Sequence, residues 1–438
     1  MSSTTTIPLH SLEISRAFSY RSVSAISFFR GSLPSEYISK KIVSIVQLNP
    51  WLNGFLKKSP TGANISFQNP LPDASDIEKK HLRVIDDDSL NENFPFREYF
   101  KRYANLLVKF GSECLNKENE SLFRIILISI APEKFAIICS LSHVLGDGHT
   151  FYSIYGMLSQ SVAAYSLNRL PLSNFESQSE SAMNGDDSKA FLSSPSTIIR
   201  LILLNTFQSR QRDYLFLLDE KWIAQEKSTA VRLDPSCSFV STNDVVTSWF
   251  FRLVRSNVAL MAANMRDRLP GLGNANAGNY QVGVAYQPAD YATPTLVRKS
   301  IADPNRIARV ASGALPGPLA TLFGDFRIGI MTNWSTFYQD LVLEGCKQIV
   351  HFPIMGPGGG NYLTDMAIIF RPNKGQLAAY VGTRSCSDEV IRSQGIYLSP
   401  LLGEIRKEKS EKYSIHRNFW FLLAIALAVT FISFYYSK

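Results

Sequence analysis

Residues 122–148 read LFRIILISIAPEKFAIICSLSHVLGDG. Two apolar runs, 122–130 and 135–141, flank the turn residues of APEK, which predicts a pair of strands that ends at His143. After Gly148 the pattern changes to a helical period, with apolar residues on one face at Phe151, Ile154, Tyr155, Leu158, Val162 and Tyr165. The sequence therefore predicts that SHVLGDG forms the turn between a strand and a helix.

This turn carries residue types that suit acid–base chemistry. His143 offers an imidazole, Asp147 offers a carboxylate four residues later, and Gly148 permits a sharp turn. A strand that delivers a histidine to a turn holds a base rigidly, and an unperturbed histidine titrates near ~6.5, which suits proton removal at neutral pH. Two alternatives stay open: the carboxylate pairs with the imidazole as in a triad, although no GxSxG nucleophile is present, or the stretch is a surface turn with an incidental histidine.

The composition is that of a globular chain with room for two cores of ordinary size. The 438 residues are 45% hydrophobic and 19% charged, which favours two domains. A polar stretch rich in Ser, Asn, Asp and Glu separates the two halves of the chain. We therefore expect an N-terminal domain over 1–172, an exposed linker over 173–198 and a C-terminal domain over 199–403.

Charge, cysteines and histidines exclude several classes. The net charge is +8, but the basic residues are scattered along the sequence, which argues against nucleic-acid binding. A phosphate-bearing cofactor or an anionic membrane face would account for the excess of positive charge. Five widely spaced cysteines without a CxxC pair indicate neither disulfides nor zinc, and favour a reducing compartment. The other histidines lack ligand spacing, so we expect no metal. His149 is interpreted as a surface residue at a helix start, with a second polar group in the site as the alternative.

Two kinds of motif stand out in the second half. Ser241 and Asp244 have capping-box spacing before an apolar run, which predicts a helix start. GLGNANAGNY and PIMGPGGGN are rich in glycine but lack the spacing of nucleotide-binding loops. We interpret both as ordinary loops.

The C-terminal region has the pattern of a membrane anchor. Residues 419–436 read FWFLLAIALAVTFISFYY, eighteen residues without a charge, and a helix of that length spans roughly 27 Å of a ~30 Å hydrocarbon core. The basic polar hinge over 404–418 holds five Lys or Arg, whereas only Lys438 follows the span, which predicts a cytosolic body. A single-pass tail anchor is expected, with the endoplasmic reticulum as a candidate membrane. A buried terminal helix is the alternative.

Five segments together resemble a known enzyme family. SHVLGDG is similar to the HxxxDG signature of BAHD and related coenzyme A-dependent acyltransferases, within the chloramphenicol acetyltransferase-like superfamily. The segments STNDVVTSWFFR, NMRDRLPGLGNANAGNY, MTNWSTF and GPGGGNYLTDMAIIF follow in the family's order. The resemblance implies an α/β fold of two domains, each a mixed β-sheet with helices, and an active-site channel between them.

The family also implies roles for particular residues. His143 would be the general base, and Asp147 would be turned away from the substrate to hold the loop through Arg266. Gly148 would relieve crowding where substrate enters. Thr332 would stabilise the oxyanion, and Trp334 would form a wall of the acyl pocket. The implied reaction moves an acyl group from acyl-CoA, a substrate and not a bound cofactor, to a hydroxyl or amine of a small-molecule or lipid acceptor, and we expect a monomer.

Departures from the family leave two alternatives. Of the family's DFGWG segment only Gly345 survives, within LEGC, and Ser142 replaces the first histidine of the double-histidine families. One alternative is a wax ester or diacylglycerol-type lipid acyltransferase of the same superfamily, which the membrane span favours. The other is a non-catalytic, membrane-tethered binding protein.

Overall fold

The strands expected in residues 122–141 form an antiparallel hairpin. In the computed structural model, β6 (Phe123–Ala131) pairs with β7 (Lys134–Ser142), and Ile126 lies opposite Ile138. The structure describes residues 3–15, 22–60, 62–183, 187–207, 211–303, 305–324, 326–355 and 364–402. Within these ranges no helix is long and apolar enough to cross a membrane. The expected hinge over 404–418 and span over 419–436 lie outside them, as does most of the glycine-rich PIMGPGGGN.

The hairpin lies inside a mixed five-stranded sheet of order β12-β2-β7-β6-β5. β5 (Leu82–Asp86) runs parallel to β6, whereas β2 (Ser22–Arg30) and β12 (Lys347–Pro353) continue the sheet in antiparallel pairing. β12 comes from the second half of the chain, so the expected boundary near residue 172 does not divide the sheets. Gly345, the residue that remains of the family's DFGWG segment, lies in the turn before β12. Its φ of +67° is a left-handed conformation that favours glycine.

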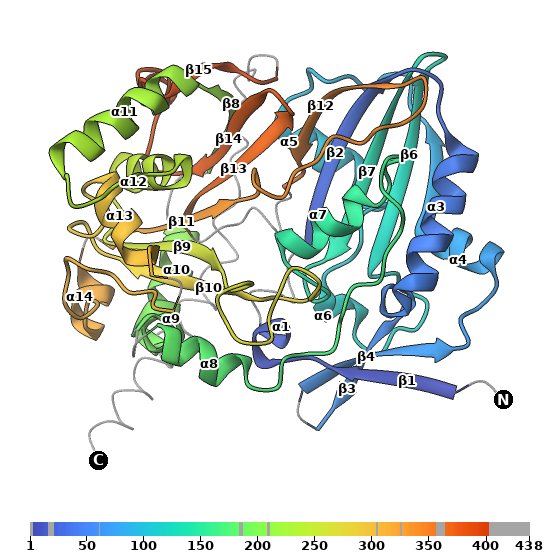
Figure 1. Ribbon diagram of the computed structural model, residues 1–438, viewed down its shortest axis with the longest axis horizontal. Coiled ribbons are helices and arrows are strands. Elements are labelled where there is room, and N and C mark those ends of the chain that lie inside the picture. Colours follow the sequence, from blue (N-terminus) through green and yellow to red (C-terminus); the bar gives the residue numbers. More distant parts are fainter. Residues whose placement is uncertain are drawn as a thin grey trace. The chain divides into compact units, whose positions relative to one another are not determined.

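The second half builds a mixed seven-stranded sheet of order β10-β9-β11-β13-β14-β8-β15. Its strands are β8 (Arg212–Leu218), β9 (Val258–Asn264), β10 (Gln281–Tyr286), β11 (Ile328–Asn333), β13 (Asp365–Asn373), β14 (Gln376–Thr383) and β15 (Tyr397–Pro400). β11 runs parallel to both β9 and β13, and the other pairs are antiparallel. Figure 1 shows this sheet beside the five-stranded one.

Alternation along the strands gives the seven-stranded sheet two buried faces. On β13, Met366, Ile368 and Phe370 join the core that surrounds the five-stranded sheet, whereas Ala367 and Ile369 join a second core beneath α12 (Thr242–Val254). Successive strand residues point to opposite faces, so a strand buried on both sides is apolar throughout. The α/β fold of two halves, each with a mixed sheet and helices, is confirmed. Side chains of both halves meet in the first of these cores, and the described residues up to 402 belong to one compact unit.

A small antiparallel sheet and short helices complete the first half. The sheet has the order β1-β4-β3, formed by Ser3–Pro8, Gly62–Asn69 and Phe55–Ser59. The helices are α1 (Ser11–Ile14), α3 (Ser35–Leu48), α4 (Ala74–His81), α5 (Phe96–Tyr103), α6 (Gly111–Cys114) and α7 (Gly148–Gly156), with the 3-10 turn η1 (Pro50–Asn53). α3 and α4 contact β5, and α4 also contacts β6.

The segment expected as an exposed linker is folded. Within 173–198 the structure places α8 (Phe175–Ala182), α9 (Ser188–Ser193) and the start of α10 (Pro195–Phe207). Phe175 and Phe191 are buried, so each packs its helix against the rest of the protein. Two aromatic residues do not change the polar average composition of this stretch, and for that reason its composition indicated an exposed linker. The remaining helices are α11 (Glu220–Leu233), α12, α13 (Pro294–Ile301), α14 (Pro318–Phe323) and α16 (Asp388–Arg392).

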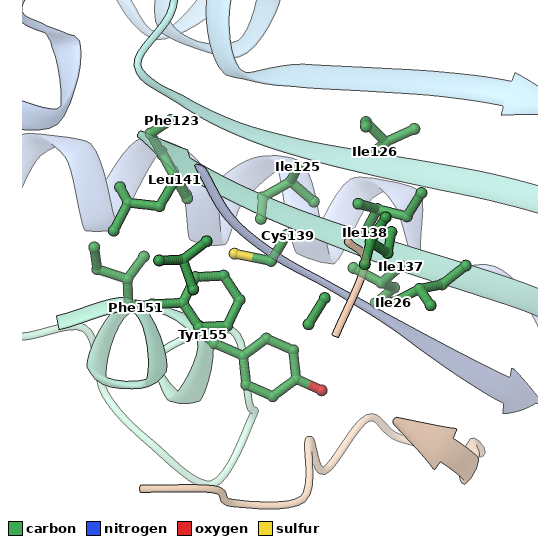
Figure 2. Close-up of a cluster of buried hydrophobic side chains, with 14 of the residues drawn as sticks. Ile26, Phe123, Ile125, Ile126, Ile137, Ile138, Cys139, Leu141, Phe151 and Tyr155 are labelled. Atoms are coloured by element: carbon green, nitrogen blue, oxygen red, sulfur yellow. The ribbon is translucent and has the colours of Figure 1, made fainter. Parts of the chain in front are cut away.

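The helix after SHVLGDG is shorter than its apolar stripe predicted. α7 ends at Gly156, so Val162 and Tyr165 lie beyond it. Figure 2 shows Phe151 and Tyr155 of α7 beside Cys139 of β7, and all three side chains are fully buried. This contact fixes the start of α7, and with it the turn, against the five-stranded sheet.

Candidate functional site

The SHVLGDG turn is fixed by a helix cap. β7 ends at Ser142 and α7 begins at Gly148, and Asp147 is the N-cap residue. Its Oδ1 accepts hydrogen bonds from the Thr150 backbone N–H at 3.0 Å and from the Thr150 hydroxyl at 3.2 Å. A capping carboxylate satisfies donors at a helix start and interacts favourably with the helix dipole.

Asp147 also forms a buried ion pair with Arg266. The Arg266 guanidinium donates from Nη1 to Oδ2 at 2.7 Å and from Nη2 to Oδ1 at 3.2 Å, and the Tyr280 backbone N–H donates to Oδ2 at 3.1 Å. Both residues are buried. Burial alone raises the pKa of the Asp147 carboxyl, but Arg266 and the Thr150 N–H outweigh it and hold that pKa below its ordinary value. The carboxylate is therefore ionised at neutral pH, with both oxygens occupied by these donors.

Arg266 in turn holds the chain segment that faces the turn. It donates to the backbone carbonyls of Asn276 at 2.9 Å and Gly278 at 3.0 Å. The bidentate geometry, with both charges removed from solvent, gives a directional link between the two halves of the chain. This contact is the one that the family resemblance implies.

Asn279 connects the same segment to the histidine. Its side-chain Nδ2 donates to the His143 backbone carbonyl at 2.7 Å, and its backbone N–H donates to Glu13 Oε1 at 3.1 Å. Gly278, just before it, has φ +138°, and a Cβ there would lie 3.2 Å from Glu13 Oε1. Asn279 of the second half therefore holds the backbone of His143, and Glu13 of the first half holds Asn279.

Glu13 and Arg169 form a second buried ion pair that the sequence did not reveal. Arg169 Nη2 donates to Glu13 Oε1 at 2.9 Å and to the Val144 carbonyl at 3.4 Å, and both side chains are almost fully buried. The two partners are 156 residues apart, so no local pattern could pair them. The motif turn is thus fixed by one ion pair at Asp147 and another behind Val144.

Four of the predicted site residues line one cavity of about 280 Å³. They are Asp147, Gly148, Thr332 and Trp334. Thr332 lies near the end of β11 and Trp334 follows that strand, where its backbone N–H donates to the Ile369 carbonyl at 2.8 Å. A Cβ on Gly148 would lie 3.2 Å from Cδ1 and Nε1 of Trp334, so glycine allows the helix start and the indole to approach closely.

The other two predicted site residues do not line this cavity. Arg266 lies behind Asp147, as its hydrogen bonds require. His143 is half-buried at the end of β7 and is also absent from the cavity wall. The structure therefore places Asp147 and Gly148 of the motif turn on the same cavity as Thr332 and Trp334. The role of His143 as a base stays a prediction.

His149 lines the cavity, contrary to the surface position favoured from the sequence. The side chain is half-buried, and its ring meets the Phe337 ring edge to face, with centroids 5.4 Å apart. Burial, and then the charge of Arg266, lower the pKa of His149, which keeps the imidazole neutral at neutral pH. The first turn of α7 faces the protein interior because Asp147, its N-cap residue, pairs with Arg266. This pairing is a tertiary contact.

Two arginines make the same cavity basic. Arg268 donates to the backbone carbonyls of Asp303 and Ile301, each at 3.2 Å, and Arg298 donates from Nε to Asp244 Oδ2 at 2.7 Å. Asp244 is the predicted capping-box residue of α12, and the structure confirms that box with Ser241. The guanidinium groups suit an anionic ligand such as a phosphate. In the described ranges, no group of three or more His, Cys, Asp or Glu is placed to hold a metal ion.

The arrangement of the sheets defines the class of fold. No protein-family model matches the sequence, and no curated protein sequence matches it. The chain has the chloramphenicol acetyltransferase-like fold, because solved structures of that fold superpose on it over most of both chains, with a TM-score of up to 0.57 among those compared.

Three of these structures show the extent of the likeness. TRI101 of F. graminearum, solved with coenzyme A and deoxynivalenol, has a TM-score of 0.57 and 14% identity over 88% of this chain and 96% of its own. Polyketide synthase associated protein 5 from Mycobacterium tuberculosis has a TM-score of 0.54 and 15% identity over 87% and 96%. The starter condensation domain of rhizomide synthetase RzmA, a double mutant in complex with C8-CoA and Leu-SNAC, has a TM-score of 0.52 and 12% identity over 88% and 91%.

Proposed function

We propose that this protein is an acyltransferase that moves an acyl group from an acyl-CoA thioester to a hydroxyl or amine of an acceptor. The observation that carries the proposal is the SHVLGDG turn, held by two buried ion pairs beside a basic cavity that Thr332 and Trp334 line. The fold supports it, since TRI101 and the RzmA domain, which share it, were solved with coenzyme A or C8-CoA.

The proposed reaction uses His143 as general base. The imidazole takes the proton of the acceptor hydroxyl or amine, the acceptor attacks the thioester carbonyl, and a tetrahedral oxyanion forms. The Thr332 hydroxyl donates a hydrogen bond to that oxyanion. Collapse of the intermediate breaks the carbon–sulfur bond, and the protonated His143 returns the proton to the leaving thiolate. Asp147 takes no proton, because Arg266 keeps it ionised and engaged.

The basic cavity would bind the donor. Arg268 and Arg298 offer guanidinium groups to the phosphates of coenzyme A, and the cavity that they line also holds Thr332, so the thioester would reach the oxyanion donor. The net charge of +8 agrees with an anionic substrate.

The test is a thiol-release assay with the full-length protein in mild detergent, across acyl-CoA donors of increasing chain length and a pool of alcohols, amines and lipid extract. We expect His143→Ala to lower turnover roughly 10²- to 10⁴-fold with unchanged circular dichroism. An unchanged rate in a folded variant would refute the mechanism. Coenzyme A binding without turnover of any donor would identify a binding protein instead. Long-chain donors with lipid products would identify the lipid acyltransferase, and base-labile products would be esters and not amides.

We also propose that residues 419–436 span a membrane and leave the body in the cytosol. The support is the uncharged run and the basic residues over 404–418 that precede it. A membrane span would concentrate the enzyme near an apolar acceptor or product. Carbonate extraction of membranes that contain the full-length protein tests this, since release into the supernatant would rule the span out.

A further inference from the structure

The short helix α14 carries its large apolar residues on the outside. Leu319 and Phe323 are 73% and 82% exposed, whereas Thr321 between them is buried. Residues four apart lie on the same face of a helix, and a residue two positions away lies on the opposite face. The Thr321 hydroxyl donates to the Gly317 carbonyl at 3.0 Å. The outer face of α14 is therefore apolar and the inner face carries a hydroxyl, which is the reverse of the usual pattern of a surface helix.

The position of α14 is fixed by the residues around it. Leu315 and Phe326, which flank the helix, are buried in one core. Arg200 of α10 donates to the backbone carbonyls of Leu322 at 3.4 Å and Gly324 at 3.0 Å, where α14 ends. Figure 1 shows α14 at the margin of the protein, beside α10. The packing of the fold therefore holds the apolar face in an exposed position.

The chain around α14 is uncharged over a long stretch. Residues 310–324 read VASGALPGPLATLFG, fifteen residues without a charge. The nearest charges along the sequence are Arg309 and Asp325. Arg309 pairs with Asp187 at 2.6 Å, and Asp325 lies outside the described residues. An uncharged run can enter an apolar medium without removing an ionised side chain from water.

The exposed face is too small for a stable protein partner. Protein interfaces use roughly 20–30 residues on each side, whereas the run 310–324 offers three large exposed apolar side chains, those of Val310, Leu319 and Phe323. A bilayer needs no matching shape. Leu and Phe side chains on a helix enter the boundary between lipid headgroups and acyl chains to a depth of about 5–10 Å.

The proposed membrane span would keep this face near a bilayer. The hinge over 404–418 joins the body to the uncharged run over 419–436. Fully extended, such a hinge reaches roughly 50 Å, which is close to the diameter of about 55 Å that a body of 403 residues should have. The hinge therefore brings the body to the bilayer but leaves its orientation free. Because a tethered contact is intramolecular, a weak apolar contact is enough to select one face.

We infer that the outer face of α14 enters the surface of the bilayer that holds the proposed span, and that this contact orients the body on the membrane. The inference goes beyond the proposed acyltransferase activity, and it uses the proposed span only as the tether. Leu319 and Phe323 would lie at the level of the upper acyl chains.

The test places one NBD fluorophore on the full-length protein, reconstituted into phosphatidylcholine vesicles. The label is attached to Ala320→Cys on α14 or, as the matched control, to Ala74→Cys on α4. Both alanines are exposed, and α4 lies at the opposite margin of the protein in Figure 1. Cys346→Ser removes the half-buried cysteine, and the other four are buried. A lipid with a nitroxide at the top of its acyl chain should quench the label on α14 at least about threefold more than the label on α4.

A second variant tests the apolar face itself. Phe323→Asp, combined with the label on α14, puts a carboxylate on the exposed face and leaves the core unchanged. Entry into the bilayer would remove that carboxylate from water, so quenching should fall to the level of the α4 label. Leu233→Asp replaces another exposed apolar residue, on α11, and should leave the quenching unchanged.

Several outcomes overturn the docking inference. Equal quenching of the two labels, or quenching that Phe323→Asp does not reduce, would each do so. A change of NBD emission in detergent that depends on protein concentration and not on lipid would identify a second copy of the chain as the occupant instead.

Carbonate extraction of the same vesicles separates this result from the proposed span. If the protein resists carbonate but the two labels are quenched equally, only the docking inference fails. If carbonate releases the protein while the α14 label is selectively quenched at neutral pH, the docking contact stands and the span fails. Release together with equal quenching overturns both. Thiol release from acyl-CoA reports on the acyltransferase proposal independently of either result.

Discussion

Replacing Asp147 by asparagine tests whether the buried ion pair holds the motif turn. Asparagine caps helices about as well as aspartate, so the hydrogen bonds to Thr150 can persist. The amide nitrogen that replaces Oδ2 is a donor, so the variant loses the charge opposite Arg266 and the hydrogen bonds that Oδ2 accepts from Arg266 and from the Tyr280 N–H. Removing one partner of a buried pair costs about 3–5 kcal/mol. Arg266 keeps the carbonyls of Asn276 and Gly278 as acceptors, so we expect the lower end, about 3 kcal/mol.

That cost converts to a measurable shift in melting temperature. With about 2.1 cal/mol/K of unfolding entropy per residue over the 403 residues of the compact unit, about 3 kcal/mol lowers Tm by about 3–4 °C. Scanning calorimetry of the wild type and Asp147→Asn measures it. Arg268→Met is the matched control, because its guanidinium bonds only backbone carbonyls among its described hydrogen bonds, and it should shift Tm by less than about 1 °C.

The pH dependence provides a second readout. The pKa of Asp147 in the folded protein is below its unfolded value of about 3.8, so the stabilisation is fully present above about pH 4 and is lost as pH falls through the folded pKa. The Tm difference between wild type and Asp147→Asn should therefore be constant from about pH 6 to 8 and should narrow below about pH 4.

Activity should fall together with stability in Asp147→Asn, because a loosened turn no longer holds His143. If Asp147→Asn melts within about 1 °C of the wild type, the Asp147–Arg266 ion pair does not stabilise the motif turn. If such a variant also lost turnover, the carboxylate would act in the chemistry. In the double variant Asp147→Asn/Arg266→Met, the loss of stability should be smaller than the sum of the two single losses, since neither charge is left alone.

Three further variants address the rest of the site. Thr332→Val should lower kcat roughly 10²- to 10³-fold with little change in donor KM, whereas Thr229→Val on α11 should change neither; a change in KM alone would make Thr332 a binding residue. Glu13→Gln leaves Arg169 buried without its charged partner, so Tm should fall by about as much as in Asp147→Asn, and an unchanged Tm would show that the second ion pair does not stabilise the turn. Gly148→Ala puts a Cβ 3.2 Å from the Trp334 ring and should lower turnover, whereas Gly283→Ala, whose Cβ meets nothing within 4 Å, should not; equal effects would exclude the steric explanation.

Local pattern was enough to predict the part of the site that lies in one stretch of chain. The alternation and period change around SHVLGDG predicted β6, β7 and the start of α7, and the spacing of Ser241 and Asp244 predicted the start of α12. These features depend on backbone propensity and on which face is apolar, and both are written in neighbouring residues. The resemblance to HxxxDG acyltransferases rested on such local segments, which is why it led to the right fold.

Contacts between distant residues were decided only by the tertiary structure. β12 joins the first sheet across more than 300 residues of chain, and Glu13 meets Arg169 and Asn279 although no periodicity links them. His149 lines the basic cavity instead of facing solvent for the same reason. Local sequence determines which surfaces favour burial. Ion pairs and cavity walls are formed by residues that only the complete tertiary packing brings together. The energy of a buried ion pair also depends on the water that this packing excludes.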